Sequence, residues 1–191
     1  LRNEFGIGIS MSTTPSCDLH QLLLKENDRF ICKESNKNRI SYIQNNAKER
    51  DIIFAGVSNP SDLEQGSVMK IAEIAREKNM NVVYFTPIPK WERLEPVVYN
   101  LCIYGSEIQW YRPKGSEICS NYSEISRKVY KEKANKTLDY LKRVEQSYPN
   151  FHVFPIHEFL CDSSKCPSHI NGFRLYRDNN GHISIYTAKQ Y

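Results

Sequence analysis

The chain has 191 residues, and its 40% hydrophobic and 25% charged content is the ordinary composition of one globular domain with a sizeable core. Its 26 basic and 22 acidic residues leave a net charge of +4, spread too evenly along the chain for a nucleic-acid partner. No stretch approaches about 18 consecutive apolar residues, so no segment is predicted to cross a membrane.

Apolar runs alternate with amphipathic segments along the sequence. In chain order, the pattern predicts a strand over 5–13, a helix over 27–48, a strand over 51–57, a helix over 68–79, a strand over 81–89, a helix over 122–148 and a strand over 151–156. Strands that are apolar on both faces and alternate with helices are typical of a parallel sheet with helices on both sides. The sequence therefore predicts a single domain over 1–191, a three-layer α/β/α sandwich with a mainly parallel sheet.

A long aromatic connection over 90–121 leaves the carboxyl end of one predicted strand. It contains Trp91, Tyr104, Trp110 and Tyr111. One interpretation is a disulfide-bonded excursion whose rings pack on the domain. The other is a rim over the site, because ligands bind at the carboxyl ends of such strands and flat rings can stack on sugars. The second interpretation makes Trp91 and Trp110 candidate substrate-binding residues.

Six cysteines fall into three pairs with separations of 15, 17 and 5 residues. This even, local spacing predicts three disulfides in an oxidising compartment. They are Cys17–Cys32, Cys102–Cys119 and Cys161–Cys166. The alternative is a cytosolic protein with six reduced thiols.

The last cysteine pair also raises the question of zinc. His157, Cys161, Cys166 and His169 have the right ligand types, in the order H-x3-C-x4-C-x2-H. The cysteines are farther apart than the usual two-residue spacing, and His157 lies at the start of a predicted helix, where it can simply be a surface residue. We therefore favour the disulfide and expect no metal. The chain has no GxGxxG motif and no P-loop, and no cofactor is expected.

The segment LYRDNNGHIS (175–184) places Asp178 and His182 on either side of Asn179-Asn180-Gly181. Asn and Gly tolerate left-handed backbone conformations, so a plain turn explains the pattern. The alternative is an acid–base pair presented on that turn. The two residues alone do not decide between these interpretations.

The run FLCDSSKCPSHINGFRLYRDNNGHIS resembles the closing segment of the SGNH-type domains that follow the transmembrane acyltransferase family 3 domain in surface-polysaccharide acyltransferases. The matching positions are Cys161, Cys166, Gly172, Leu175, Tyr176, Asp178, His182 and Ser184. Less specific matches are TTPSCDL (13–19) and VVYFTPIPKWE (82–92), so that the resemblance spans most of the chain.

The resemblance implies an SGNH/flavodoxin-like fold with His182 as a catalytic base and Asp178 as the acid that orients it. It also maps an oxyanion-hole donor loosely onto Asn59 of GVSN. The family's nucleophile is the Ser of a Gly-Asp-Ser block after the first strand, and this chain contains no such block. The first residues, LRNEFGIGIS, lack an initiator Met and the layout of a signal peptide. We therefore expect the first strand and the nucleophile to lie upstream of Leu1, which would leave this piece inactive alone.

The chain departs from the family pattern in three places. The family usually places Asp three residues before His, where this chain has Asn179, and Asp178 lies four residues before His182. The block around Asn59 has one residue too many. The Gly-Ala that follows the family's histidine is Thr187-Ala188 here.

The function implied by the resemblance is transfer of an acyl group, acetyl first, onto or off a cell-surface glycan by a Ser-His-Asp-type mechanism. A membrane acyltransferase domain in the same polypeptide would supply the acyl group. The expected location is periplasmic or extracellular, tethered to the membrane by that domain. The alternatives are a non-catalytic carbohydrate-binding module on the same fold and a secreted carbohydrate esterase.

Overall fold

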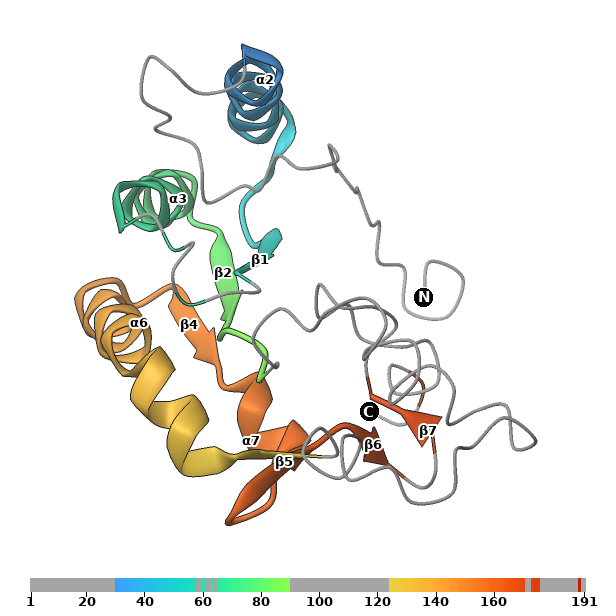
Figure 1. Cartoon of the computed structure of the whole chain (residues 1–191). Helices are drawn as coiled ribbons and strands as arrows, with labels where there is room; N and C mark the ends of the chain where they lie inside the picture. Colours follow the sequence, from blue (N-terminus) through green and yellow to red (C-terminus); the bar gives the residue numbers. More distant parts are fainter. Residues whose placement is uncertain are drawn as a thin grey trace.

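The computed structural model describes residues 30–57, 60, 63, 65–89, 124–170, 173–175 and 189 (Figure 1). Their helices are α2 (Phe30–Asn46), α3 (Gln65–Glu77), α6 (Arg127–Ser147) and α7 (Ile156–Leu160). Their strands are β1 (Ile52–Gly56), β2 (Asn81–Phe85), β3 (Glu124–Ser126), β4 (Phe151–Phe154), β5 (Lys165–Pro167), β6 (His169–Ile170) and β7 (Phe173–Arg174).

Three of these strands form a parallel sheet in the order β1-β2-β4. The register pairs Gly56 with Phe85 and Phe85 with Phe154, so the three strands end at one common carboxyl edge. β3 pairs antiparallel with β5, and β6 with β7. The prediction of an α/β fold with a mainly parallel sheet is therefore confirmed.

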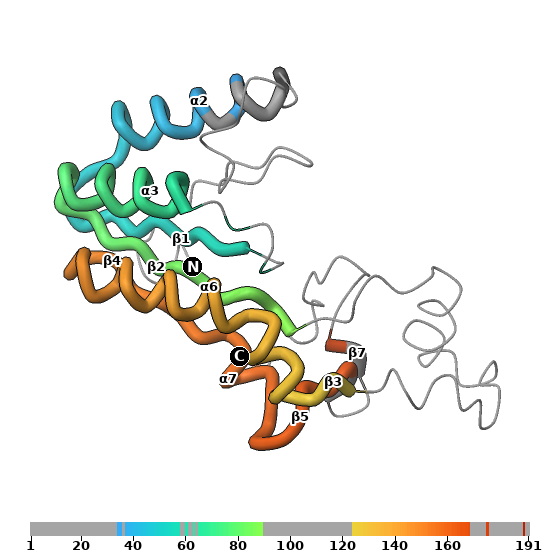
Figure 2. Tube along the Cα trace, turned by 60° about the vertical axis from the view of Figure 1, so that its left-hand side comes forward, coloured from blue at the N-terminus to red at the C-terminus, as the bar shows by residue number. Residues whose placement is uncertain are grey.

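One face of the sheet is buried in the main hydrophobic core. Alternate residues of the strands point into it, among them Ile53, Val82, Tyr84 and Phe151. The helices supply the facing side chains, which are Val68, Ile71, Ala72 and Ala75 from α3, Leu141 and Val144 from α6, and the partly buried Ile43 from α2. Figures 1 and 2 show α3 running between α2 and α6. All three long helices thus contribute to a single core.

The opposite face of the sheet carries exposed apolar side chains at β1. Ile52 is 51% exposed and Phe54 65% exposed. Phe54 stacks on Phe85, Phe85 packs edge-on against Phe154, and Phe154 stacks on Phe159 of α7, with ring centroids 6.2, 5.3 and 4.9 Å apart. We call these four rings the phenylalanine row.

A glycine allows the close approach of two strands under this row. A Cβ atom added at Gly56 would meet the Cβ of Phe85 at 3.0 Å and its carbonyl oxygen at 3.2 Å. A side chain at position 56 would therefore crowd Phe85 where both strands end.

The element boundaries differ from the sequence prediction by a few residues in several places, such as the strand predicted over 151–156, which ends at Phe154 before α7. Two of the differences have a clear physical reason. The helix predicted over 122–148 begins at Arg127, because Glu124–Ser126 form β3, which pairs with β5. The strand predicted over 81–89 ends at Phe85, since Pro87 and Pro89 have no N–H to donate to a ladder. The strand predicted over 5–13 lies outside the described residues.

We expect Leu141→Ala to destabilise the fold by about 2–5 kcal/mol, because Leu141 is fully buried between α6 and the sheet. The measurement is the free energy of unfolding from chemical denaturation. The neighbouring exposed Lys142→Ala is the matched control and should change it by less than about 0.5 kcal/mol. Equal effects of the two substitutions would show that the core is not where the structure places it.

Candidate functional site

The carboxyl edge of the sheet is held together by the residues that follow its strands. The backbone N–H of Thr86, directly after β2, donates to the carbonyl of Phe154 at the end of β4 over 3.0 Å. After β1, the carbonyl of Pro60 accepts a hydrogen bond from the Thr137 hydroxyl of α6 over 3.0 Å. The exits of all three strands are thus tied to neighbouring elements, as expected of a site at this edge.

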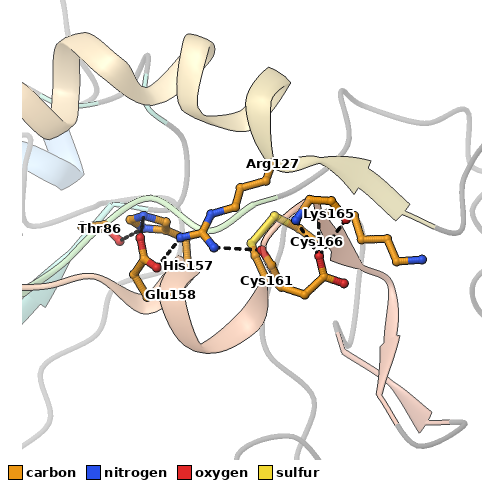
Figure 3. A network of polar contacts seen from close by, with 9 residues as sticks. Thr86, Arg127, His157, Glu158, Cys161, Lys165 and Cys166 are labelled. Atoms are coloured by element: carbon orange, nitrogen blue, oxygen red, sulfur yellow. Dashed lines mark hydrogen bonds and ion pairs between the residues drawn. A yellow bond between two sulfur atoms is a disulfide. The ribbon is translucent and has the colours of Figure 1, made fainter.

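A string of polar side chains crosses this edge from β2 to α7 (Figure 3). The hydroxyl of Thr86 lies 3.3 Å from Nδ1 of His157, and Nε2 of His157 lies 3.1 Å from a carboxylate oxygen of Glu158. An ionised carboxylate can only accept hydrogen bonds, so Nε2 of the neutral imidazole carries the proton and donates to Glu158. Nδ1 is then the acceptor, and the Thr86 hydroxyl donates to it.

The order hydroxyl, imidazole, carboxylate is that of a hydrolase triad, but the geometry is not. In a triad the hydroxyl faces Nε2 and the carboxylate faces Nδ1, which is the reverse of the arrangement here. Thr86 is only 1% exposed, so its hydroxyl cannot reach a substrate in this structure. We therefore assign Thr86, His157 and Glu158 a structural role at the edge of the site.

Arg127 connects this string to the loop between Cys161 and Cys166. Its guanidinium forms an ion pair with the second carboxylate oxygen of Glu158, and its Nη1 donates to the carbonyl of Asp162 over 2.8 Å. Its backbone N–H donates to the carbonyl of Ser164 over 2.9 Å. One residue at the start of α6 therefore contacts both α7 and the loop.

The loop itself is closed by the Cys161–Cys166 disulfide, one of the three that the cysteine spacing predicts. Inside it, the Asp162 carboxylate accepts hydrogen bonds from the backbone N–H groups of Ser164 and Lys165, both over 2.8 Å. These N–H groups hold the pKa of Asp162 below its usual range. The loop is thus fixed by its own bonds as well as by Arg127.

Burial and charge set the protonation of the string. Burial lowers the pKa of His157, and the nearby charges of Arg127 and Lys131 lower it further, against the opposing effect of Glu158. The hydrogen bond from Arg127 lowers the pKa of Glu158. Burial raises the pKa of Tyr130 to about 12. Near neutral pH the string therefore contains a neutral imidazole and a charged Glu158–Arg127 pair, and the nearby phenol of Tyr130, which donates to the Pro87 carbonyl, is neutral.

Leu175 joins the C-terminal part of the chain to the same edge. Its side chain is fully buried and packs in a cluster with Leu160, Ile88 and Ile156. Ile88 follows β2, and Ile156 and Leu160 belong to α7, after β4. The Leu175 N–H donates to the carbonyl of Ser168 over 2.7 Å. The chain thus returns to the carboxyl edge three residues before Asp178.

Most of the site residues expected from the sequence lie outside the described residues. These are the catalytic candidates Asp178 and His182, the oxyanion candidate Asn59, the aromatic candidates Trp91 and Trp110, and the cysteines Cys17, Cys102 and Cys119. Cys32 lies in α2, where only its backbone is described. The structure does describe Gly56, which ends β1 at the carboxyl edge, and Pro60, whose carbonyl accepts a hydrogen bond from Thr137 of α6.

Of the four residues considered as zinc ligands, the structure describes the side chains of His157, Cys161 and Cys166. Cys161 and Cys166 are bonded to each other, and no group of three or more potential ligands gathers among the described side chains. His157 is 5% exposed, so the expectation of a surface residue was wrong for it. Its partner Thr86 is 71 residues away in sequence, and no local pattern signals such a contact.

Residues 2–191 match the model of a protein family described as "SGNH domain (fused to AT3 domains)". No curated protein and no solved structure matches the chain. Within the described residues, no helix has the length and hydropathy needed to span a membrane.

We expect the fold to lose stability on acidification through His157. Its pKa is lower in the folded state than the ordinary value of about 6.5. At pH values between these two pKa values, the unfolded chain therefore binds more protons than the folded chain. The contribution of His157 to the free energy of unfolding is therefore complete above about pH 6.5 and is lost as the pH falls toward its folded-state pKa. The melting temperature of the unaltered protein should therefore drop by about 2–4 °C more between pH 7 and pH 5 than that of His157→Gln.

His152→Gln is the matched control for this experiment, because His152 is exposed on β4. It should keep the full pH dependence. If His157→Gln shows the same acid loss as the unaltered protein, the buried imidazole is not responsible for it.

The second expectation concerns the Cys161–Cys166 disulfide. Closing so short a loop lowers the conformational entropy of the unfolded chain, which stabilises the fold by on the order of 2 kcal/mol. Cys166 is 1% exposed in the fold. The double variant Cys161→Ala, Cys166→Ala should lower the free energy of unfolding by about this amount in chemical denaturation. A change below about 0.5 kcal/mol would mean that Arg127 and Asp162 hold the loop without the bond.

Proposed function

The chain belongs to the family of SGNH domains that are fused to AT3 domains, and we propose that it takes part in O-acyl transfer to a cell-surface glycan. The group transferred is an acyl group, acetyl first. The AT3 membrane domain, in the same polypeptide, delivers it. The domain therefore works outside the cytoplasm, in the periplasm or at the cell surface, tethered through that membrane domain.

The observation that carries this proposal is the anchoring of Leu175. Its fully buried side chain contacts residues that follow β2 and β4, at the edge where α/β sheets bind their substrates. Asp178 is three residues beyond Leu175 in sequence, and three residues of chain span at most about 11 Å. A site built on Asp178 and His182 is therefore compatible with the carboxyl edge.

Each residue has a definite task in the proposed chemistry. His182 accepts the proton of the serine hydroxyl, and the Asp178 carboxylate holds the imidazole tautomer and stabilises the imidazolium. The serine oxygen attacks the acyl carbonyl, the bond to the acyl donor breaks, and the leaving atom takes the proton from His182. Donors such as Asn59 stabilise the oxyanion that forms in between.

The second half of the reaction uses the same groups in the reverse order. A glycan hydroxyl gives its proton to His182 and attacks the acyl-serine, and the serine oxygen leaves with that proton. The nucleophile belongs to a Gly-Asp-Ser block that we place upstream of Leu1. Trp91 and Trp110 provide flat rings on which the glycan stacks.

The Cys161–Cys166 disulfide supports the location. Disulfides persist in oxidising compartments and are rare in the cytosol. The bond also holds the segment that leads to Leu175, so its integrity matters to the proposed site.

A second candidate is a non-catalytic carbohydrate-binding module. It is favoured by two features of the sequence, the absence of a Gly-Asp-Ser block and the position of Asp178, which is four residues before His182. Glycan binding without turnover by the AT3-linked protein would support this candidate.

We expect His182→Ala, in the protein that includes the AT3 domain and the upstream block, to lower acyl transfer by several orders of magnitude, because triad members act as a unit. Asp178→Asn should cost less, since the carboxylate orients the imidazole without carrying the proton. The measurement is the rate of acyl transfer to the glycan, with the exposed His152→Ala as control.

Three results would count against the assignment. Full transfer by His182→Ala would remove the catalytic role of the histidine. A silent Asp178→Asn would mean that another group orients the imidazole. Serine-dependent ester turnover by residues 1–191 alone would place the nucleophile inside this chain.

A further inference from the structure

Arg127 makes three bonds that join elements far apart in sequence. Its guanidinium pairs with Glu158 in α7 and donates to the carbonyl of Asp162, and its backbone N–H donates to the carbonyl of Ser164 (Figure 3). The Arg127 side chain is only 16% exposed. These bonds fix the Cys161–Cys166 loop against the start of α6.

The partner of Arg127 is in turn fixed to the sheet. Glu158 accepts a hydrogen bond from His157, which contacts the Thr86 hydroxyl directly after β2. Thr86 and His157 are both almost completely buried, so this end of the string cannot move without opening the core. The string from Thr86 to Arg127, which we call the edge clamp, therefore sets the position of the loop relative to the carboxyl edge.

The loop determines where the following chain runs. Cys166 is 1% exposed and lies in β5, which pairs with β3 directly before Arg127. Ser168 comes two residues later, and its carbonyl accepts the N–H of Leu175. The segment with Asp178 and His182 therefore follows a residue, Leu175, that is bonded to the part of the chain that the edge clamp holds in place.

We propose that Arg127 is a positioning residue for the acid–base pair Asp178 and His182, acting through the Cys161–Cys166 loop and Leu175. The inference rests on the proposed function and adds to it a residue that touches neither substrate nor reacting atoms. In this proposal the edge clamp holds the acid–base segment at a fixed position relative to the carboxyl edge of the sheet.

The chemistry of the clamp requires arginine at this position. The guanidinium presents several donors in one rigid plane, which lets it serve the Glu158 carboxylate and the Asp162 carbonyl together. A lysine has the same charge but a single compact ammonium group. Arg127→Lys should therefore keep the ion pair with Glu158 and the backbone bond to Ser164, and lose the hydrogen bond to the Asp162 carbonyl.

The test measures acyl transfer in the AT3-linked protein for Arg127→Met and Arg127→Lys. Misplacement of a catalytic group by about 1 Å costs up to about 100-fold in rate. We expect kcat to fall by about 10- to 100-fold for Arg127→Met and by less for Arg127→Lys, with KM within about 2-fold of the unaltered protein. Lys128→Met, which removes the same charge at the neighbouring exposed position, should leave both constants unchanged.

The pH dependence of kcat/KM separates positioning from a loss of folded protein. A carboxylate beside an imidazole raises the pKa of the imidazole. If Asp178 no longer reaches His182, the acid limb of the profile should move to lower pH in Arg127→Met, and it should stay in place in Lys128→Met. A merely structural loss lowers the amplitude of the profile and leaves its shape unchanged.

The possible outcomes can be told apart. If His182→Ala abolishes transfer while Arg127→Met keeps both kcat and the acid limb, the positioning role is overturned and the proposed function stands. If His182→Ala transfers at the normal rate, both fail, because there is no acid–base pair to position. Should Arg127→Met not fold, Arg127→Lys decides by the same two measurements.

Discussion

A right-handed crossover between neighbouring parallel strands places its helix on only one face of the sheet. The chain makes this step twice in the same direction, from β1 to β2 through α3 and from β2 to β4 through α6. Both helices must therefore lie on the same face, and the core forms there. The other face is also rich in apolar side chains. This is typical of parallel strands, because helices cover both faces of a doubly wound sheet.

The same crossovers bring the ends of β1, β2 and β4 to one edge. The residues directly after each strand are then forced into close proximity, although Thr86 and His157 are far apart in sequence. Polar groups buried at such an edge need partners, and the string from Thr86 to Arg127 supplies them. The charged end of this string faces the disulfide loop, so the sheet and the C-terminal segment are coupled through a few short contacts.

The periodicity of the sequence was sufficient to predict α2, α3, α6 and the three parallel strands, because their apolar patterns are local. It missed β3, since Glu124–Ser126 continue smoothly into a helical pattern and owe their extended form to pairing with β5. It also missed the burial of His157, whose hydrogen-bond partner Thr86 is 71 residues away in sequence. The Cys161–Cys166 bond was predictable because its partners are only five residues apart. The roles of Asp178 and His182 depend on the family resemblance, and their side chains lie outside the described residues.

The phenylalanine row has a practical consequence for work with pieces of this protein. A fragment trimmed to the described elements would present Phe54 and Ile52 to water on a broad sheet face, beside a strand edge at β1. Surfaces of this kind drive colloidal self-association, and open edges add strand-to-strand contacts. The boundaries chosen for expression will therefore affect solubility, and Phe54→Lys is the natural solubilising substitution.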